Sequence, residues 1–246
     1  MGLLNKLGIG AVGRQASRPP QAKGNPPSPG FHPPAVGATR APELHETTRL
    51  SNGLKEFLWN LDGLGRGTLL DLGPAWQTTL SFFIERGFRV SSEDILRAWK
   101  TFMTEEEGRL REIGAIDESL DMTPNGRAAR FLESNLQYAA SSFDAVLLWD
   151  LLDYFEPALG KQMVTTLTDF LRPGGVVFAM FHSKKPAGFQ RYRVLDSNNL
   201  QVISSPILCP AQKVFQNREI QDLFLRYRTM KSFVSRDQLR ETLFIK

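Results

Sequence analysis

One segment, GTLLDLGPAWQ at residues 67–77, constrains the fold of this chain more than any other. It joins a short apolar run, an acid at position 71, a single glycine at position 73 and the start of an amphipathic stretch. This order is typical of a buried strand that turns tightly into a helix. In parallel α/β sheets such a turn lies at the carboxyl edge, where nucleotide cofactors bind. The segment therefore predicts an open parallel sheet with a ligand site beside this turn.

Strand-like and helix-like segments alternate along the rest of the chain. Strands are expected at residues 68–72, 88–91, 130–132, 143–149 and 176–181. Helices are expected at residues 75–86, 93–113 and 157–171. A lead-in helix precedes the first strand, because apolar residues recur at helical spacing from Leu50 to Leu61. Repeated units of this length predict a parallel sheet that carries helices on both faces.

The last third departs from this repeat. Residues 189–195 and 200–203 are expected to form an added hairpin, and residues 217–225 a helix capped by Asn217. The final two strand-like segments flank a tight turn at residues 236–238, so the last strand must run antiparallel to its neighbour. The expected fold class is therefore α/β: a Rossmann-like, doubly wound sheet in three α/β/α layers, mostly parallel with an antiparallel last strand.

The N-terminal 42 residues differ in composition from the rest. They are rich in Pro, Gly and Ala, and up to position 44 the chain holds five basic residues against Glu43, which accounts for the whole net charge of +4. Such a segment cannot offset its ordering entropy, so residues 1–42 are expected to be a disordered basic tail. Apolar residues at positions 3, 4, 7 and 9 leave docking on a partner or membrane as the alternative. The domain proper is expected at residues 43–246, and its neutral charge disfavours a nucleic-acid partner.

Cysteine and histidine usage argues against disulfide and metal chemistry. Cys209 is the only cysteine, and His32, His45 and His182 are not at a metal-ligand spacing. No run approaches the ~20 apolar residues that span a bilayer, and the first residues lack a secretory pattern. We therefore expect a cytoplasmic protein that uses no metal.

Four segments, in this order, resemble motifs of the class I S-adenosylmethionine-dependent methyltransferases. They are LLDLGP at 69–74, GFRVSSED at 87–94, SFDAVLLWDLLDY at 142–154 and LRPGGVV at 171–177. The resemblance runs from about residue 64 to residue 246. It implies the fold described above, S-adenosylmethionine as the cofactor, and methyl transfer to an acceptor that we expect to be a small molecule.

The resemblance also implies roles for residues after the first two strands. Asp71 and Gly73 would hold the amino-acid end of the cofactor, with Pro74 in the same loop. Asp94, after the second strand, would bind the ribose diol. Glu93 is the alternative source of that carboxylate, and helix capping is the alternative use of both acids.

Further residues complete the expected site. Glu133 falls where the family often has an adenine-contacting acid, with a surface glutamate as the alternative. Trp149 would wall the pocket, and Asp150 would orient the acceptor nucleophile or act as a weak base; core packing and helix capping are their alternatives. His182 follows the fifth strand, where a lone histidine is often incidental. Few catalytic groups are needed, because the sulfonium is already activated and positioning supplies much of the rate.

The glycine turn departs from the family pattern at Ala75 and Gln77, where glycine is usual. Gln77 would lie close to the carboxylate end of the cofactor, where its amide could donate a hydrogen bond or its bulk could narrow the site. The alternative function is therefore a catalytically inactive, methyltransferase-like binding or scaffold domain. A nicotinamide-dependent dehydrogenase fits less well, because Gly73 lacks the partner glycines of G-x-G-x-x-G.

Overall fold

The structure is a computed structural model, and it describes residues 46–113, 121–205, 210–235 and 237–246. The expected tail at residues 1–42 and Cys209 lie outside the described residues. The described residues between Glu46 and Lys246 belong to one compact unit.

The main sheet has six strands in the order β3-β2-β4-β5-β9-β8. Four of them are parallel: β2 (Gly67–Asp71), β3 (Phe88–Ser92), β4 (Phe143–Trp149) and β5 (Leu171–His182). The last strand, β9 (Leu239–Ile245), runs antiparallel to β5, and β8 (Thr229–Val234) pairs with β9 at the edge. This mostly parallel sheet with an antiparallel last pair confirms the expected Rossmann-like class.

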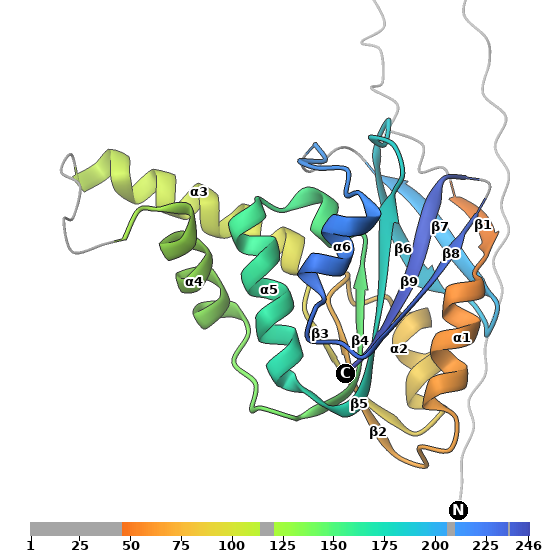
Figure 1. Cartoon of the computed structure of the whole chain (residues 1–246). Helices are drawn as coiled ribbons and strands as arrows, with labels where there is room; N and C mark the ends of the chain where they lie inside the picture. The colour runs from red at the N-terminus through yellow and green to blue at the C-terminus, as the bar shows by residue number, and fades with distance from the viewer. Residues whose placement is uncertain (1–45, 114–120, 206–209, 236) are drawn as a thin grey trace, which may run out of the picture. The chain divides into compact units, whose positions relative to one another are not determined.

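Helices cover both faces of this sheet (Figure 1). The first face carries α1 (Asn52–Leu61) and α2 (Gln77–Ile84), and the second carries α3 (Ile95–Ile113), α4 (Pro124–Asn135), α5 (Pro157–Phe170) and α6 (Asn217–Leu223). Alternate residues of β4 supply the two cores, with Ala145 and Leu147 in the first and Val146 and Leu148 in the second. All four of these side chains are buried, as expected for a strand covered on both faces.

A second sheet of three antiparallel strands stands beside α2. It consists of β1 (Glu46–Leu50), β7 (Asn199–Ser205) and β6 (Phe189–Val194), in the order β1-β7-β6. The β6–β7 hairpin occupies the expected region, whereas β1 was not anticipated from the sequence. The backbone N–H of Val194 donates to Thr79 Oγ1 of α2 over 2.9 Å, which fixes the hairpin to the first core.

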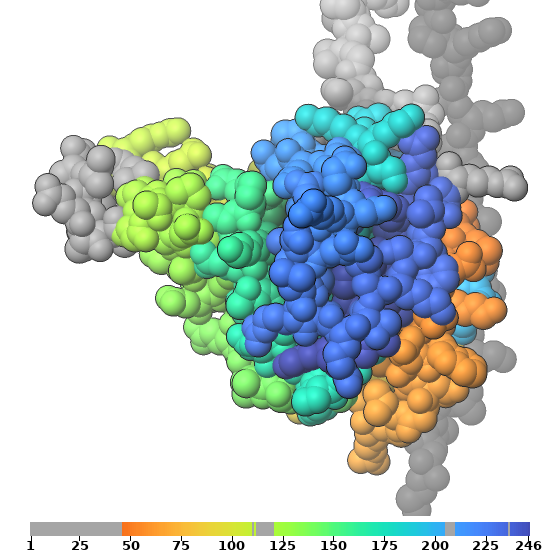
Figure 2. Space-filling view, in the orientation of Figure 1, coloured from red at the N-terminus to blue at the C-terminus, as the bar shows by residue number. Residues whose placement is uncertain are grey.

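The expected strand at residues 130–132 is wrong, because these residues lie inside α4. Thr123 caps this helix by accepting a hydrogen bond from the Gly126 N–H, and Pro124 occupies its first turn. Buried Ala128, Phe131 and Leu132 then recur at helical spacing. In Figure 2 the surface of α4 (yellow-green) adjoins that of α5, which it packs against.

The expected cap of α6 is also shifted by one residue. Gln216, not Asn217, is the N-cap, and it forms a capping box with Glu219. A capping box requires Glu or Gln three residues after the N-cap. Glu219 lies three residues after Gln216 but only two after Asn217. None of the helices described in the structure is long and apolar enough to cross a membrane.

Candidate functional site

The turn after β2 is held together by Asp71 and Trp149. Asp71 is buried, and its Oδ1 accepts hydrogen bonds from the Gly73 N–H (2.9 Å) and from Trp149 Nε1 (2.7 Å). A Cβ atom at position 73 would lie 2.7 Å from Trp149 Nε1. The glycine therefore makes room for the indole of this chain, which fills the space directly above the turn.

The Asp71 carboxyl is only partly satisfied. Its Oδ2 is buried and has no hydrogen-bond partner among the described residues. Burial raises the pKa of Asp71 from 3.8 to about 6, against the opposing hydrogen bonds from Trp149 and Gly73. A buried acid with a free oxygen and a perturbed pKa is typical of a binding site.

Gln77 does not face this turn. It is the first residue of α2, its side chain is exposed, and its amide donates to Ser81 Oγ one helical turn later. Ala75 is exposed as well, and Pro74 is half-buried.

Asp94 makes two polar contacts. Its Oδ1 accepts a hydrogen bond from the Arg97 N–H (3.3 Å), which caps α3, and its Oδ2 pairs with Arg191 Nη1 of β6 (3.0 Å). It also edges a cleft of 670 Å³, hereafter the Asp94 cleft. The residues that line the Asp94 cleft include Pro74, Trp76, Asp94, Arg97, Lys100 and Arg191. A volume of this size is usual for small-molecule sites.

The two other expected acids are placed elsewhere. Glu93 accepts a hydrogen bond from the Tyr138 hydroxyl (2.6 Å), so its carboxylate already has a partner. Glu133 is exposed on α4 because the segment expected to approach the sheet as a strand is helical. Of the two candidates for the ribose-binding acid, only Asp94 lines the cleft.

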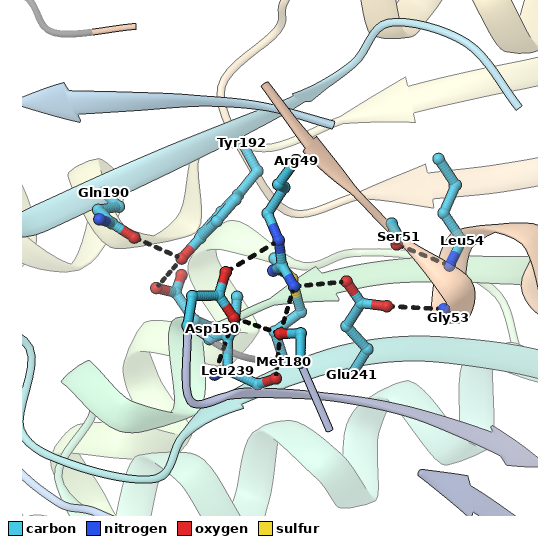
Figure 3. Close-up of polar contacts among 12 residues, drawn as sticks. Arg49, Ser51, Gly53, Leu54, Asp150, Met180, Gln190, Tyr192, Leu239 and Glu241 are labelled. Atoms are coloured by element: carbon cyan, nitrogen blue, oxygen red, sulfur yellow. Dashed lines mark hydrogen bonds and ion pairs between the residues drawn. The ribbon is translucent and has the colours of Figure 1, made fainter. Parts of the chain in front are cut away.

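Asp150 follows β4 and is buried against β6. Its Oδ2 lies 3.3 Å from the Tyr192 hydroxyl, as drawn in Figure 3. The Tyr192 ring stacks on Trp149, with centroids 6.0 Å apart and an interplanar angle of 11°. Burial raises the pKa of Asp150 to about 7, against the charge of His182.

The structure brings His182 and Asp153 to this place as well. His182 Nδ1 lies 2.9 Å from Asp153 Oδ2 and 3.8 Å from Asp150 Oδ2, and the His182 N–H donates to the same Asp153 oxygen. We name Asp150, Asp153, His182 and Tyr192 the His182 cluster. Asp153, Tyr192 and Arg191 were not predicted from the sequence as site residues. The acid three residues after Asp150 was the one signal that pointed to a further member of the cluster.

The His182 cluster borders a second cleft of 370 Å³, hereafter the His182 cleft. The residues that line it include Arg49, His182, Lys184, Lys185, Tyr192 and Leu239. Arg191 and Tyr192 are successive residues of β6, so their side chains point to opposite faces of the hairpin. Arg191 therefore lines the Asp94 cleft, whereas Tyr192 lines the His182 cleft and stacks on Trp149.

The site has room for the nucleoside half of the expected cofactor but not for its amino-acid half. The Asp94 cleft has room for a nucleoside, and a carboxylate at its edge suits a ribose diol. The space above Gly73, where the amino-acid half is expected, is filled by Trp149. Within the described part of the chain, no group of three or more His, Cys, Asp or Glu side chains could hold a metal ion.

Comparison with solved structures finds many chains with a similar arrangement. A Burkholderia thailandensis 1,6-didemethyltoxoflavin-N1-methyltransferase, solved with 1,6-didemethyltoxoflavin and S-adenosylhomocysteine, is 15% identical over 79% of this chain and 78% of its own, with a TM-score of 0.41. A Mesorhizobium loti S-adenosylmethionine-dependent methyltransferase is 14% identical over 78% and 96%, with a TM-score of 0.43. A glycopeptide N-methyltransferase solved with S-adenosylmethionine is 13% identical over 79% and 94%, with a TM-score of 0.39.

No protein-family model matches the chain, and the search of curated proteins finds no relative. At these identities and TM-scores, the assignment of the fold rests on the strand order and the directions of the strands.

Proposed function

We propose that this domain binds S-adenosylmethionine at the carboxyl edge of β2, β3 and β4 and transfers its methyl group to a small-molecule acceptor. The bound sulfonium would supply an activated methyl carbon. The observation that supports this most is Asp94, a carboxylate two residues after the end of β3 that lines a cleft of nucleoside size. In open α/β sheets, ligands bind at this edge.

The loop after β2 adds to the proposal. Asp71 keeps a buried oxygen without a partner, and Pro74 lines the same cleft as Asp94. In this proposal Asp94 holds the ribose, Asp71 and Gly73 take the amino-acid end, and Gln77 and Glu133 have no part. Both Arg191 and the Trp149 indole must then move, since they occupy Asp94 and the space above Gly73.

Trp149 supports a second candidate function. Its Nε1 is bonded to Asp71 and its ring is stacked on Tyr192, so it is held on two sides where the amino-acid half would lie. If Trp149 stays in place, the domain would bind a nucleoside without methyl transfer, as a methyltransferase-like binding module.

Calorimetric titration with S-adenosylhomocysteine and with adenosine separates these functions. The proposed methyltransferase binds S-adenosylhomocysteine more tightly than adenosine, because the amino-acid half contributes contacts. Equal affinities would favour the nucleoside-binding module, and no binding of either ligand at millimolar concentration would overturn both.

Asp94→Asn tests the ribose contact. Asparagine can still cap α3, but its amide cannot accept two hydrogen bonds from a diol, so we expect affinity for S-adenosylhomocysteine to fall at least about tenfold, or ~1.4 kcal/mol. The matched control is Asp222→Asn on α6, where the aspartate is exposed. An unchanged affinity in Asp94→Asn would remove Asp94 from the site.

A further inference from the structure

The His182 cluster has the arrangement of a proton acceptor. Asp153 is fully buried, and its Oδ2 binds both the ring Nδ1 and the backbone N–H of His182. Two contacts to one oxygen fix the position of the imidazole and place the proton of a neutral ring on Nδ1. Nε2 then carries the lone pair.

These contacts use only one of the two ring nitrogens of His182. His182 Nε2 has no hydrogen-bond partner among the described residues, and the side chain lines that cleft. We propose that His182, positioned by Asp153, accepts the proton of an acceptor that carries an ionisable hydroxyl and an anionic group. The assignment rests on the methyl transfer proposed above and names the class of its acceptor.

The charges around the His182 cleft favour an acceptor that carries an anionic group. Arg49 is neutralised by Asp237 and Glu241. Lys184 and Lys185 are exposed at the cleft and have no ion-pair partner among the described residues. Two exposed ammonium groups beside a cleft of 370 Å³ favour a small acid over a neutral molecule.

In the proposed step, the acceptor gives a proton to His182 and receives a methyl group on its oxygen. The O–H bond of the acceptor breaks and its proton goes to His182 Nε2. The electron pair left on oxygen would form the bond to the methyl carbon of a bound donor, while the bond from that carbon to the sulfonium sulfur would break and leave its electrons on sulfur. Asp153 stabilises the imidazolium that results.

Several charges set the protonation of this imidazole. Burial lowers the pKa of His182, but the hydrogen bond with Asp153 and the charges of Asp150, Asp153 and Asp237 outweigh it, so the pKa is raised above 6.5. The neutral, proton-accepting form is therefore lost at mildly acidic pH. Arg49 and the two lysines line the same cleft and are the opposing charges.

Acylation by diethyl pyrocarbonate, followed by peptide mass mapping, tests the inference without any methyl donor. The reagent attacks a neutral, accessible imidazole, so His182 should react with a midpoint above pH 6.5. In Asp153→Asn, which loses the charge but keeps a side chain of the same size, the midpoint should move to lower pH. No reaction of His182 up to pH 8, or an unchanged midpoint, would overturn the inference.

Protection experiments test the acceptor class. We expect 4-hydroxybenzoate to protect His182 at least about fivefold better than phenol, and Lys184→Gln with Lys185→Gln to abolish the difference. Equal protection, or none by either compound, would overturn the anionic hydroxyl acceptor. His182→Gln should bind S-adenosylhomocysteine within twofold of the wild type, so failure of cofactor binding and failure of the proton acceptor are distinguishable.

Discussion

At the scale of single residues, Asp71 shows how one side chain can serve the fold and the site together. Its Oδ1 ties β2 to β4 through Trp149 and holds the following turn through Gly73, and its Oδ2 is buried without a partner among the described residues. Because burial disfavours the charged form, the folded state holds the Asp71 proton up to about pH 6.

Asp71→Asn tests this with a pH series. Between its ordinary pKa of 3.8 and about 6, the unfolded carboxyl is ionised while the folded one is not, so Asp71 lowers stability as pH rises. Asparagine keeps the acceptor for both donors and does not titrate. We expect the variant to gain about 3 kcal/mol relative to the wild type between pH 3.5 and pH 7.5, measured by urea unfolding.

The control for this series is Asp222→Asn, whose aspartate is exposed. Its difference from the wild type should stay constant across the same pH range. A difference for Asp71→Asn that also stays constant would show that the folded carboxyl titrates at its ordinary pKa.

At the scale of elements, the packing of α1 against the sheet depends on a close approach at Gly53. The Gly53 N–H donates to Glu241 Oε2 over 2.6 Å, and a Cβ at this position would lie 2.6 Å from Glu241 Cβ and 2.7 Å from the Phe178 ring. Helix and strand can meet this closely only where the side chain is absent.

Three glycine-to-alanine variants separate packing from backbone effects. Gly53→Ala should lower the free energy of unfolding by about 2 kcal/mol through overpacking, whereas Gly65→Ala, with open space around its Cβ, should change it little. Gly108→Ala lies within α3 with nothing near its Cβ, and should raise it by about 0.5–1 kcal/mol. Thermal unfolding measures all three, and a harmless Gly53→Ala would contradict the contact.

The ion pair that β6 makes with Asp94 supports a second prediction at the scale of elements. Arg191 pairs with Asp94 and competes with any ribose diol for that carboxylate. Arg191→Met should therefore tighten binding of S-adenosylhomocysteine about fivefold, as expected for a partly exposed ion pair worth ~1 kcal/mol. Arg193→Met is the control, since Arg193 pairs with Glu46 instead. Weaker binding in Arg191→Met would mean that the guanidinium contacts the ligand.

At the scale of the whole domain, an ion pair joins the two sheets. Arg49 of β1 lies 3.0 Å from Glu241 Oε1 of β9, and the other Glu241 oxygen accepts from Gly53, as Figure 3 shows. The Glu241 side chain is 2% exposed, so it depends on this partner. The contact links the strand before α1 to the last strand of the chain.

A double-mutant cycle measures this link. Arg49→Met leaves a buried charge without its partner and should cost about 3–5 kcal/mol in free energy of unfolding. Adding Glu241→Gln removes the charge but keeps an acceptor for Gly53, and should recover about 1–3 kcal/mol. Arg109→Met, which breaks an exposed pair with Glu105, is the control and should leave stability unchanged. Additive effects of the two buried substitutions would contradict the coupling.

The fold could be predicted from the sequence because its signals are local. Strand β4 is predicted from a run of seven residues that lies between two polar residues, and Pro157 predicts the start of α5. The antiparallel last strand follows from the length of its turn alone. A strand was wrongly expected at residues 130–132, which lie in α4. Over so few residues, the alternation of apolar side chains in a strand cannot be distinguished from their spacing in a helix.

What the sequence by itself determined is the position of most helices and strands and of the acids at the carboxyl edge of the sheet, since each depends on residues close together in the chain. Only the tertiary structure decided which groups those acids meet. Arg191 reaches Asp94 across 97 residues, Trp149 reaches Asp71 across 78, and His182 reaches Asp153 across 29. Such pairings follow from strand register and burial across the whole sheet, and no local pattern encodes them.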